Sequence, residues 1–187
     1  ILFPAVKNIS LGKIEQYPQR SYSRFSLDSD EKLAKIAKAL TVGSKVITYK
    51  SKQEEFNAVA TFGATEGLDM FKGENIAVIG TPHVNPITYI LLDNALGKKP
   101  RCNDTRTSMS YTKVKRGGYE FYFNTFSNDE SLREIQLFLI ESELIQAVGR
   151  ARILRNNCTV KVLSNLPLQG AEFSYLTKQE IESILTA

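Results

Sequence analysis

Two short segments contain residue types that could bind phosphate. The first is Thr61–Asp69, in which two threonines, two glycines and a final aspartate follow an apolar run. Glycine lets a ligand approach the backbone closely, threonine hydroxyls can bind phosphate oxygens, and an aspartate can accept a sugar hydroxyl or pair with an arginine. A tight turn capped by Asp69 explains the same residues, so the pattern alone leaves both interpretations open.

The second segment is Gln146–Arg152, with the sequence QAVGRAR. Gln146 and Arg150 are four residues apart, so on a helix they lie on one face. Gly149 costs about 1 kcal/mol relative to alanine in a helix interior, which suggests that packing or a close approach requires it. A planar guanidinium on a rigid helix suits a phosphate, although an amphipathic helix with solvated arginines would have the same sequence.

Positive charge is concentrated in one part of a chain of 187 residues with a net charge of +4. Residues 98–116 hold seven basic residues and one acidic residue, a net of +6, whereas the other 17 basic and 19 acidic residues give −2. The neighbouring aromatic residues are Tyr111, Tyr119, Phe121, Tyr122, Phe123 and Phe126. Such a segment could bind the phosphates and bases of a nucleic-acid strand through Lys113, Lys115 and Arg116, but a solvated hairpin explains it as well.

The composition excludes several classes of site. One histidine and two cysteines cannot form a four-cysteine zinc site or an H-E-x-x-H metalloprotease helix, and we predict no metal site. No phosphate-binding loop of the form G-x-x-x-x-G-K-[ST] and no recognisable nucleophile motif is present. No apolar run approaches 18 residues, so we expect no membrane partner. The two cysteines fit a reducing compartment, from which we expect a cytoplasmic location.

The elements that must position these segments alternate between strands and helices. Short apolar runs predict strands over 45–49, 57–62, 75–79 and 159–163, with one more near 13–17. Helical spacing predicts helices from Asp28 or Ser29 to Leu40, over 86–96, from Asn128 or Asp129 to about Ile153, and after Thr177. Residues 109–114 and 119–124 flank a Gly-Gly turn and predict a hairpin. The pattern indicates an α/β domain with a mainly parallel central sheet flanked by helices, plus a β-hairpin insertion.

Together, the two phosphate-type segments resemble the second RecA-like domain of superfamily 2 helicases. The family's T-x-x-x-x-x-G-x-D element is matched by Thr61, Gly67 and Asp69. Its Q-x-x-G-R-x-x-R helix is matched by Gln146, Gly149 and Arg150. The sequence EGLD, followed by a strand ending in GTP, is similar to the branch with DinG-type and XPD-type DNA helicases, and QAVGRAR is similar to Dicer-type and RIG-type members. The correspondence runs from about Lys45 to Leu163.

The resemblance implies an ATP-dependent motor whose nucleotide is shared with another domain. ATP and Mg²⁺ would lie in a cleft against a preceding RecA-like domain that carries the phosphate loop. Arg150 would be an arginine finger, and Gln146 would couple the sites. The nucleotide would be lined by Gly67, Asp69 and Gly149. A nucleic-acid strand, DNA in preference to RNA, would be held by Thr48, Thr61 and Thr65.

One position departs from the family pattern. The second arginine of the helix motif would fall at Ile153. Arg152 lies two residues after Arg150, about 200° away on an unbroken helix, so the two cannot face one phosphate there. Either the helix ends near Arg150 and Arg152 serves with it as a second catalytic arginine, or Arg155 takes part, or only one finger exists. The single histidine, His83, is either a polar turn residue or borders the site.

We therefore expect the C-terminal motor domain of a nucleic-acid helicase or translocase, inactive as a catalyst by itself. The chain begins at Ile1 rather than at methionine, which suggests a fragment of a longer protein. Residues 1–28 would be an irregular segment or linker from a missing first RecA-like domain, residues 29–187 the second RecA-like domain, and residues 98–127 the basic and aromatic hairpin insertion. The alternatives are a non-catalytic nucleic-acid-binding RecA-like module and a nucleotide-binding α/β domain unrelated to helicases.

Overall fold

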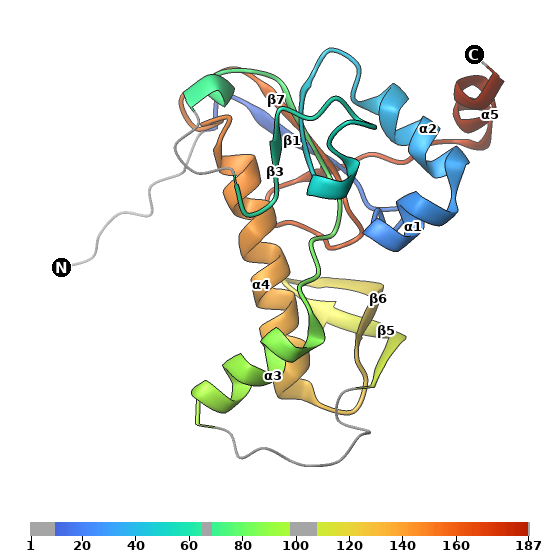
Figure 1. Cartoon of the computed structure of the whole chain (residues 1–187). Coiled ribbons are helices and arrows are strands. Elements are labelled where there is room, and N and C mark those ends of the chain that lie inside the picture. The colour runs from blue at the N-terminus through green and yellow to red at the C-terminus, as the bar shows by residue number, and fades with distance from the viewer. Residues whose placement is uncertain (1–9, 65–68, 98–107, 187) are drawn as a thin grey trace.

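The central feature of the molecule is a parallel β-sheet, seen in a computed structural model that describes residues 10–64, 69–97 and 108–186 (Figure 1). Within these residues the sheet has the strand order β3-β2-β4-β7-β1-β8, and all of its pairs are parallel. The strands are β1 (Lys13–Tyr17), β2 (Lys45–Thr48), β3 (Ala60–Thr61), β4 (Ile76–Ile79), β7 (Thr159–Leu163) and β8 (Glu172–Phe173). The predicted α/β class with a mainly parallel sheet is confirmed.

Helices cover both faces of this sheet, and an antiparallel hairpin lies apart from it (Figure 1). The helices are α1 (Arg24–Ser29), α2 (Glu31–Leu40), α3 (Pro86–Ala95), α4 (Glu130–Gly149) and α5 (Lys178–Thr186). The predicted hairpin is also confirmed, and it consists of β5 (Met109–Arg116) and β6 (Tyr119–Phe126). Among the described residues, no helix is both long enough and apolar enough to cross a membrane.

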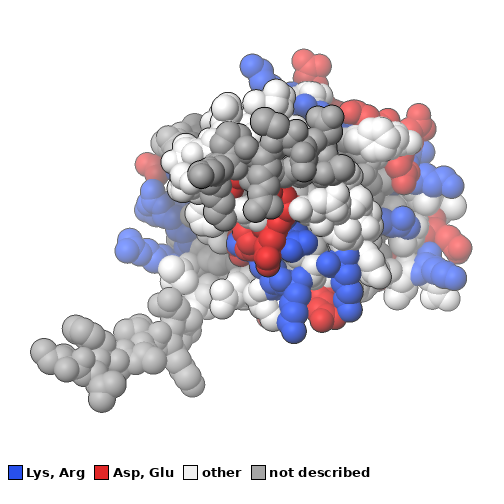
Figure 2. Space-filling view, turned by 90° about the horizontal axis from the view of Figure 1, so that it is seen from below, with Lys and Arg blue, Asp and Glu red and all other residues white. Residues whose placement is uncertain are grey.

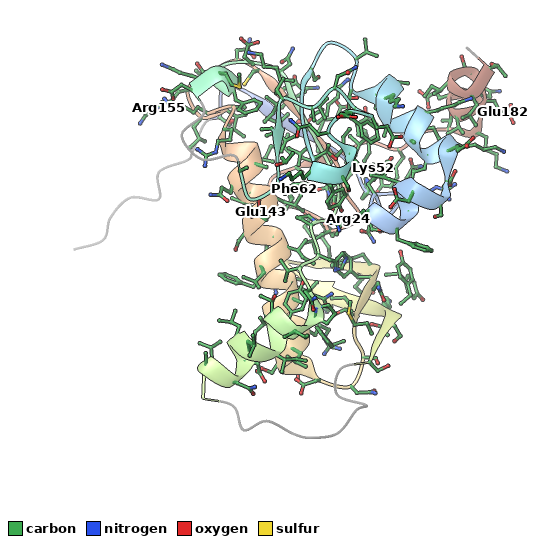
Figure 3. The ribbon with its side chains drawn as sticks, viewed as in Figure 1. Arg24, Lys52, Phe62, Glu143, Arg155 and Glu182 are labelled. Carbon is green, nitrogen blue, oxygen red and sulfur yellow. The ribbon has the colours of Figure 1, made fainter. Side chains whose placement is uncertain are left out.

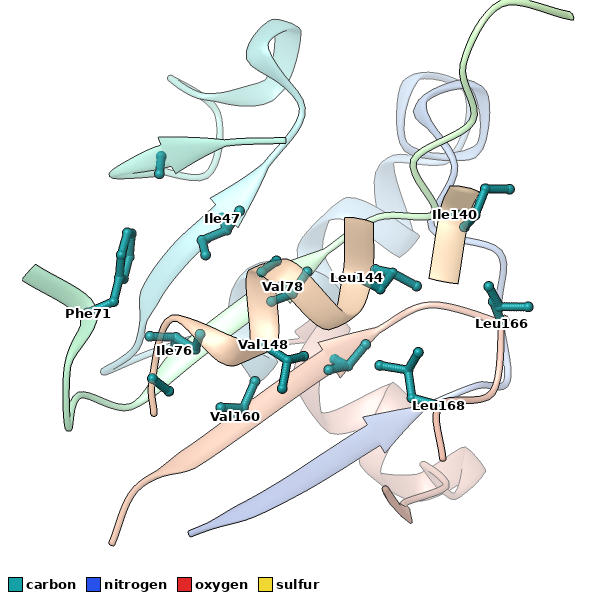
Figure 4. Packing of buried hydrophobic residues seen from close by; sticks show 14 of the residues in the cluster. Ile47, Phe71, Ile76, Val78, Ile140, Leu144, Val148, Val160, Leu166 and Leu168 are labelled. Atoms are coloured by element: carbon teal, nitrogen blue, oxygen red, sulfur yellow. The ribbon is translucent and has the colours of Figure 1, made fainter. Parts of the chain in front are cut away.

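Side chains of the sheet alternate between two separate hydrophobic cores. Ile76 and Val78 of β4 pack with Leu144 and Val148 of α4 on one face (Figure 4). Their neighbours in β4, Ala77 and Ile79, instead belong to the cluster under α1 and α2. This alternation follows from the period of two along a strand, and burial of both faces explains why the strands are continuously apolar. Helix α4 is thereby fixed across the sheet.

A third cluster holds the hairpin against the N-terminal half of α4. Tyr89 of α3, Phe126 of β6 and Leu132 of α4 are fully buried against one another. We call α3, the hairpin and residues 130–140 of α4 the hairpin module. In Figure 1 it lies below the sheet, and α4 runs through both parts. The hairpin is thus one wall of a packed unit.

Three predicted boundaries were wrong, each for a local reason. The helix predicted to end at Leu40, with Asp28 or Ser29 as its cap, begins at Glu31, because Asp30 is the cap and accepts a hydrogen bond from Leu33 N at 3.0 Å; α1 was not predicted. The strand predicted over 57–62 is reduced to Ala60–Thr61, since Asn57 has a left-handed φ of 48°. The long helix begins after its cap, Asp129, and ends at Gly149 rather than near Ile153.

Candidate functional site at the C-terminal end of helix α4

The structure brings together the two segments that carry the helicase resemblance. After β3, the backbone N–H of Gly63 donates a 2.7 Å hydrogen bond to Oε1 of Glu143 on α4. Arg152, just beyond α4, donates from Nη2 to Oδ1 of Asp69 at 2.8 Å. Figure 3 shows Phe62 and Glu143 side by side near the middle of α4. Segments about 80 residues apart in sequence therefore form one surface along this helix.

Arg150 is the residue at this surface whose side chain the fold leaves unpaired. Its backbone N–H caps the end of α4 by bonding to Ala147 O at 3.2 Å. The side chain is half-buried, and its Nε is fully buried with no hydrogen-bond partner among the described residues. An unsatisfied buried donor costs about 1–3 kcal/mol, so a structural arginine would normally be paired. An anion bound from outside would pair with the Nη groups of this half-buried guanidinium, because Nε itself is closed to solvent.

Arg152 has a different role, because the helix has already ended. Its φ of 53° places it in the left-handed region, which costs a non-glycine residue roughly 1 kcal/mol. From there its side chain reaches Asp69, so both groups are engaged with each other rather than with a ligand. The angular argument against two arginines facing one phosphate no longer applies, because α4 ends at Gly149. Arg152 is instead paired with Asp69.

The second arginine of the family motif has no structural equivalent at its expected position. Ile153 occupies that position, and its side chain packs against the main core. Arg155 is exposed at the far end of this segment (Figure 3), and no side-chain hydrogen bond is recorded for it within the described ranges. Arg150 and Arg155 therefore stay the two candidates for contact with a phosphate.

Gly149 and Gln146 flank Arg150 on the same helix. Gly149 is exposed, and a Cβ placed on it would meet no atom within 4 Å. The expectation that internal packing requires this glycine was therefore wrong, and a close approach from outside remains the other explanation. Gln146 is half-buried and lies three residues after Glu143 and four before Arg150, on the same side of α4.

The predicted strand-binding threonines differ in their availability. Thr48 is fully buried, and its hydroxyl donates a 2.8 Å hydrogen bond to Ile79 O inside the sheet. We correct its assignment, because a buried hydroxyl bonded to the neighbouring strand cannot reach a phosphate in this conformation. Thr61, at the end of β3, is buried, with 9% of its surface exposed. Thr65 and Gly67 lie outside the described residues.

The three predicted cations of the hairpin are also not equivalent. Arg116 bonds Glu141 through Nε at 3.1 Å and Nη2 at 2.7 Å, and Glu134 through Nη1 at 2.8 Å. Lys113 pairs with Glu120 across the strands, and this hydrogen bond raises the pKa of the lysine. Lys115 is exposed, with no ion pair recorded among the described residues. It is the one predicted hairpin cation with an uncompensated charge.

The remaining basic residues of the charged segment lie outside the described residues. They are Lys98, Lys99, Arg101 and Arg106. Figure 2 views the molecule from below, the side of the hairpin module, and its blue and red side chains are intermixed. The described part of this face is therefore not a continuous basic surface.

Sequence reasoning missed Glu143, which ties the loop after β3 to α4. Its signal was present, since it lies three residues before Gln146 and seven before Arg150, a spacing that places all three on one helix face. The described residues contain no group of three or more histidines, cysteines, aspartates or glutamates that could hold a metal ion. The surface thus offers an unpaired guanidinium for a phosphate rather than a metal centre.

Comparison with known proteins identifies no matching family model, no similar curated protein and no similar solved structure. The function has to be inferred from the geometry of this chain.

Proposed function

We propose that this chain is the C-terminal motor domain of an ATP-dependent nucleic-acid helicase or translocase, acting in the cytoplasm. The observation that carries the proposal is the unpaired guanidinium of Arg150, with its Nε buried and without a hydrogen-bond partner in the described parts of the chain. It lies at the end of the helix whose flanking residues contact the Gly63–Asp69 segment. In this proposal Arg150 reaches a triphosphate held mainly by a preceding RecA-like domain.

The neighbouring residues would act on the position of Arg150 and of the loop. Glu143 fixes the start of the loop through Gly63 N, and Arg152 fixes its end through Asp69. The guanidinium would stabilise negative charge that develops on the transferred phosphoryl group, and such arginine fingers contribute about 10³–10⁵ in rate. Magnesium, when bound with ATP, would neutralise phosphate charge through ligands supplied by the other domain.

The nucleic-acid strand would contact the outer face of the hairpin. Tyr111 and Tyr122 are each 59% exposed on this face, and their rings stack at 6.1 Å with an interplanar angle of 9°. Lys113, which lies opposite Tyr122, and Lys115 share the face of β5 that carries Tyr111, and aromatic rings and cations on one face suit the bases and backbone of an unpaired strand. DNA stays the favoured strand, on the resemblance to DNA helicases alone.

The test is strand-stimulated ATP hydrolysis by this chain joined to its preceding RecA-like domain. Arg150→Ala should reduce turnover by about 10³-fold or more, whereas Arg133→Ala, a matched arginine at the other end of α4, should leave it unchanged. Equal turnover of Arg150→Ala and the parent protein would reject the arginine-finger assignment.

The second candidate is a nucleic-acid-binding module without catalytic function. It is favoured by the exposed tyrosine pair, which is complete within this chain and needs no nucleotide. If Arg150→Ala leaves both strand binding and ATP hydrolysis of the joined protein unchanged, the result supports this candidate over the motor domain.

A further inference from the structure

A second candidate site lies at the opposite edge of the sheet from Arg150. The segment after α4 is at the amino edge, where Gly12 N, just before β1, bonds Ile153 O at 2.9 Å. At the carboxyl edge, a cavity of about 450 Å³ opens between α1 and the hairpin module. Carboxyl ends of parallel strands are where α/β domains bind ligands, and this volume is in the range of small-molecule sites.

A buried polar network fixes the orientation of His83, which lines this cavity. Thr125 and Gln136 are fully buried, and the threonine hydroxyl donates to Gln136 Oε1 at 2.6 Å. The amide nitrogen of Gln136 then faces Nδ1 of His83 at 3.2 Å, and also bonds Asn124 O at 3.2 Å. Since the amide nitrogen can only donate, Nδ1 accepts and the proton of the neutral ring resides on Nε2.

The imidazole is held as a neutral donor. Burial lowers the pKa of His83 to about 4, so the ring is uncharged at neutral pH. Phe123 stacks on it, with centroids 5.3 Å apart and planes inclined by 26°. No partner for Nε2 is recorded in the part of the chain that the structure describes. The network therefore fixes the direction of one N–H group on a side chain that lines the cavity.

The rest of the lining adds a cation and an exposed aromatic ring. Arg24 and Asp28 of α1 contribute opposite charges, and the Arg24 guanidinium lies 5.4 Å from the centre of the Tyr49 ring. Phe25, also part of the lining, is 79% exposed, so most of its ring is open to stack on a ligand. Asp28 is already paired with Lys52 at 2.7 Å, so Arg24 is the cation of the lining that would meet a neighbouring phosphate of a strand, while the neutral histidine would meet the base.

Asn124 places the cavity beside the outer face of the hairpin. Asn124 lines the cavity, and in the ladder it is the direct partner of Tyr111. Tyr111 in turn stacks on Tyr122. A strand whose bases stack on the two tyrosines would thus have its next base at the mouth of the cavity.

We propose that this cavity binds one unpaired base of a single-stranded nucleic acid, with His83 Nε2–H donating to a base acceptor and Phe25 stacking on the ring. The inference rests on the nucleic-acid part of the proposed function, and it is independent of Arg150 and of ATP. Base recognition by stacking and one hydrogen bond involves no released counterions, so it should not depend on salt as phosphate contacts do.

The experiment measures binding of this chain to fluorescein-labelled ten-nucleotide oligothymidylate by anisotropy, at several salt concentrations and without ATP. Phe25→Ala should weaken binding about 5- to 100-fold, the range for loss of one stacked base, with an unchanged salt slope. Phe138→Ala is the matched control, since Phe138 is a 59% exposed phenylalanine of α4 that does not line the cavity. An oligomer of ten abasic sites should bind the parent protein weakly and should not distinguish it from Phe25→Ala.

A second variant tests the hydrogen bond without removing an aromatic ring from the surface. His83→Asn retains an acceptor that can face Gln136 but lacks the Nε2 donor. It should reduce the preference for oligothymidylate over the abasic oligomer, while urea unfolding at neutral pH reports whether the fold is intact. An unaltered preference would overturn the role of His83.

The outcomes separate this inference from the proposed function. Equal binding of abasic and base-bearing oligomers would reject the base cavity but leave strand binding in place. No binding of either oligomer would reject the nucleic-acid function and the cavity together. Free thymidine is tested as a competitor at the same concentration of bases as unlabelled oligomer. If it competes as strongly as the oligomer does, the ligand is a free nucleoside and the assignment to a strand is overturned.

Discussion

Arg116 and Arg150 both lie beside helix α4, but their guanidinium groups have opposite surroundings. Arg116 makes three hydrogen bonds to two glutamates of that helix. Arg150 has a buried Nε and no hydrogen-bond partner among the residues that the structure describes. A cation that is available to a ligand is therefore identified by the absence of a hydrogen-bond partner within the described protein. Density of positive charge in the sequence does not identify it.

The period of the β-strand explains why Arg116 is satisfied. Val114 and Arg116 share the face of β5 that packs toward α4, whereas Lys113 and Lys115 point to the other face. Glu134 and Glu141 are seven residues apart on α4 and present two carboxylates to that inner face. Arg116 thus fastens the hairpin to the helix, and its neighbours in sequence cannot.

The largest expected effect is that of Arg150→Ala on ATP hydrolysis by the chain joined to its preceding domain. Turnover should fall by about 10³–10⁵, because the guanidinium acts on charge in the transition state. The midpoint of urea unfolding should stay the same or rise, because the substitution removes an unpaired buried donor. A large loss of stability instead would mean that Arg150 is a structural residue like Arg116. A further drop in the double variant with Arg155→Ala would identify a second finger.

His83 combines both situations in one ring, since its Nδ1 has a hydrogen-bond partner and no partner of its Nε2 is recorded among the described residues. Its folded pKa of about 4 lies below the ordinary histidine pKa of 6.5, so between these pH values the unfolded chain binds a proton that the folded chain does not. The contribution of His83 to the free energy of unfolding should therefore have its full value above pH 6.5 and should decrease as the pH falls toward 4. This histidine should contribute about 2–3 kcal/mol to the loss.

The measurement is urea unfolding across this pH range, with His83→Asn as the reference because carboxylates also titrate near pH 4. The difference between the two proteins should grow as pH rises from 4 to 6.5 and then become constant. Parallel stability curves would show that His83 is not buried as a neutral ring.

Arg116→Gln should act on stability rather than on strand binding. The change leaves Glu134 and Glu141 without their shared partner, and since the guanidinium is only 22% exposed we expect a loss of about 1–2 kcal/mol in urea unfolding. Lys113→Gln is the control, since its pair with Glu120 is exposed and should contribute less than about 1 kcal/mol. If both variants are equally stable, Arg116 does not fasten the hairpin to α4.

Much of the fold could be predicted from the sequence, because its signals are local. The buried strands are continuous apolar runs, and the hairpin follows from a Gly-Gly turn between alternating residues. Helix α1 was missed, because it is only six residues long and lies in a segment without a clear helical pattern, and the cap of α2 was placed at Asp28 or Ser29 instead of Asp30. The pairing of Arg116 was also out of reach, because it depends on which face of β5 meets a helix that comes later in the chain.

The site could be predicted only in part, for the same reason. The spacing of Gln146 and Arg150 correctly placed them on one side of a helix, and the structure brings that helix to the segment ending at Asp69. The sequence did not reveal that Arg152 would form an ion pair with Asp69, because this contact requires the left-handed conformation of Arg152 after the end of α4. Nor could it reveal that the Thr48 hydroxyl is bonded inside the sheet.

Gly149→Ala tests whether the open space beside Arg150 belongs to a partner. No atom lies within 4 Å of the added methyl group, so folding should be favoured by up to about 1 kcal/mol, the helix preference of alanine over glycine. The joined protein should nevertheless lose ATPase activity if the preceding domain approaches this face closely. Gain of stability without loss of activity would leave Gly149 with no functional role, and both readouts come from one variant.

The smallest effect concerns Lys115, and it decides how the hairpin contacts a strand. Three free cations would contribute about two to three units to the slope of log affinity against log salt for single strands. Since Arg116 and Lys113 are paired with glutamates, Lys115→Gln alone should reduce the slope, by about 0.7 units. Arg116→Gln should not reduce the slope at all, because its charge is already compensated within the protein. A reduction of similar size from Arg116→Gln would mean that the strand displaces Glu134 and Glu141, and it would remove the distinction between paired and unpaired arginines.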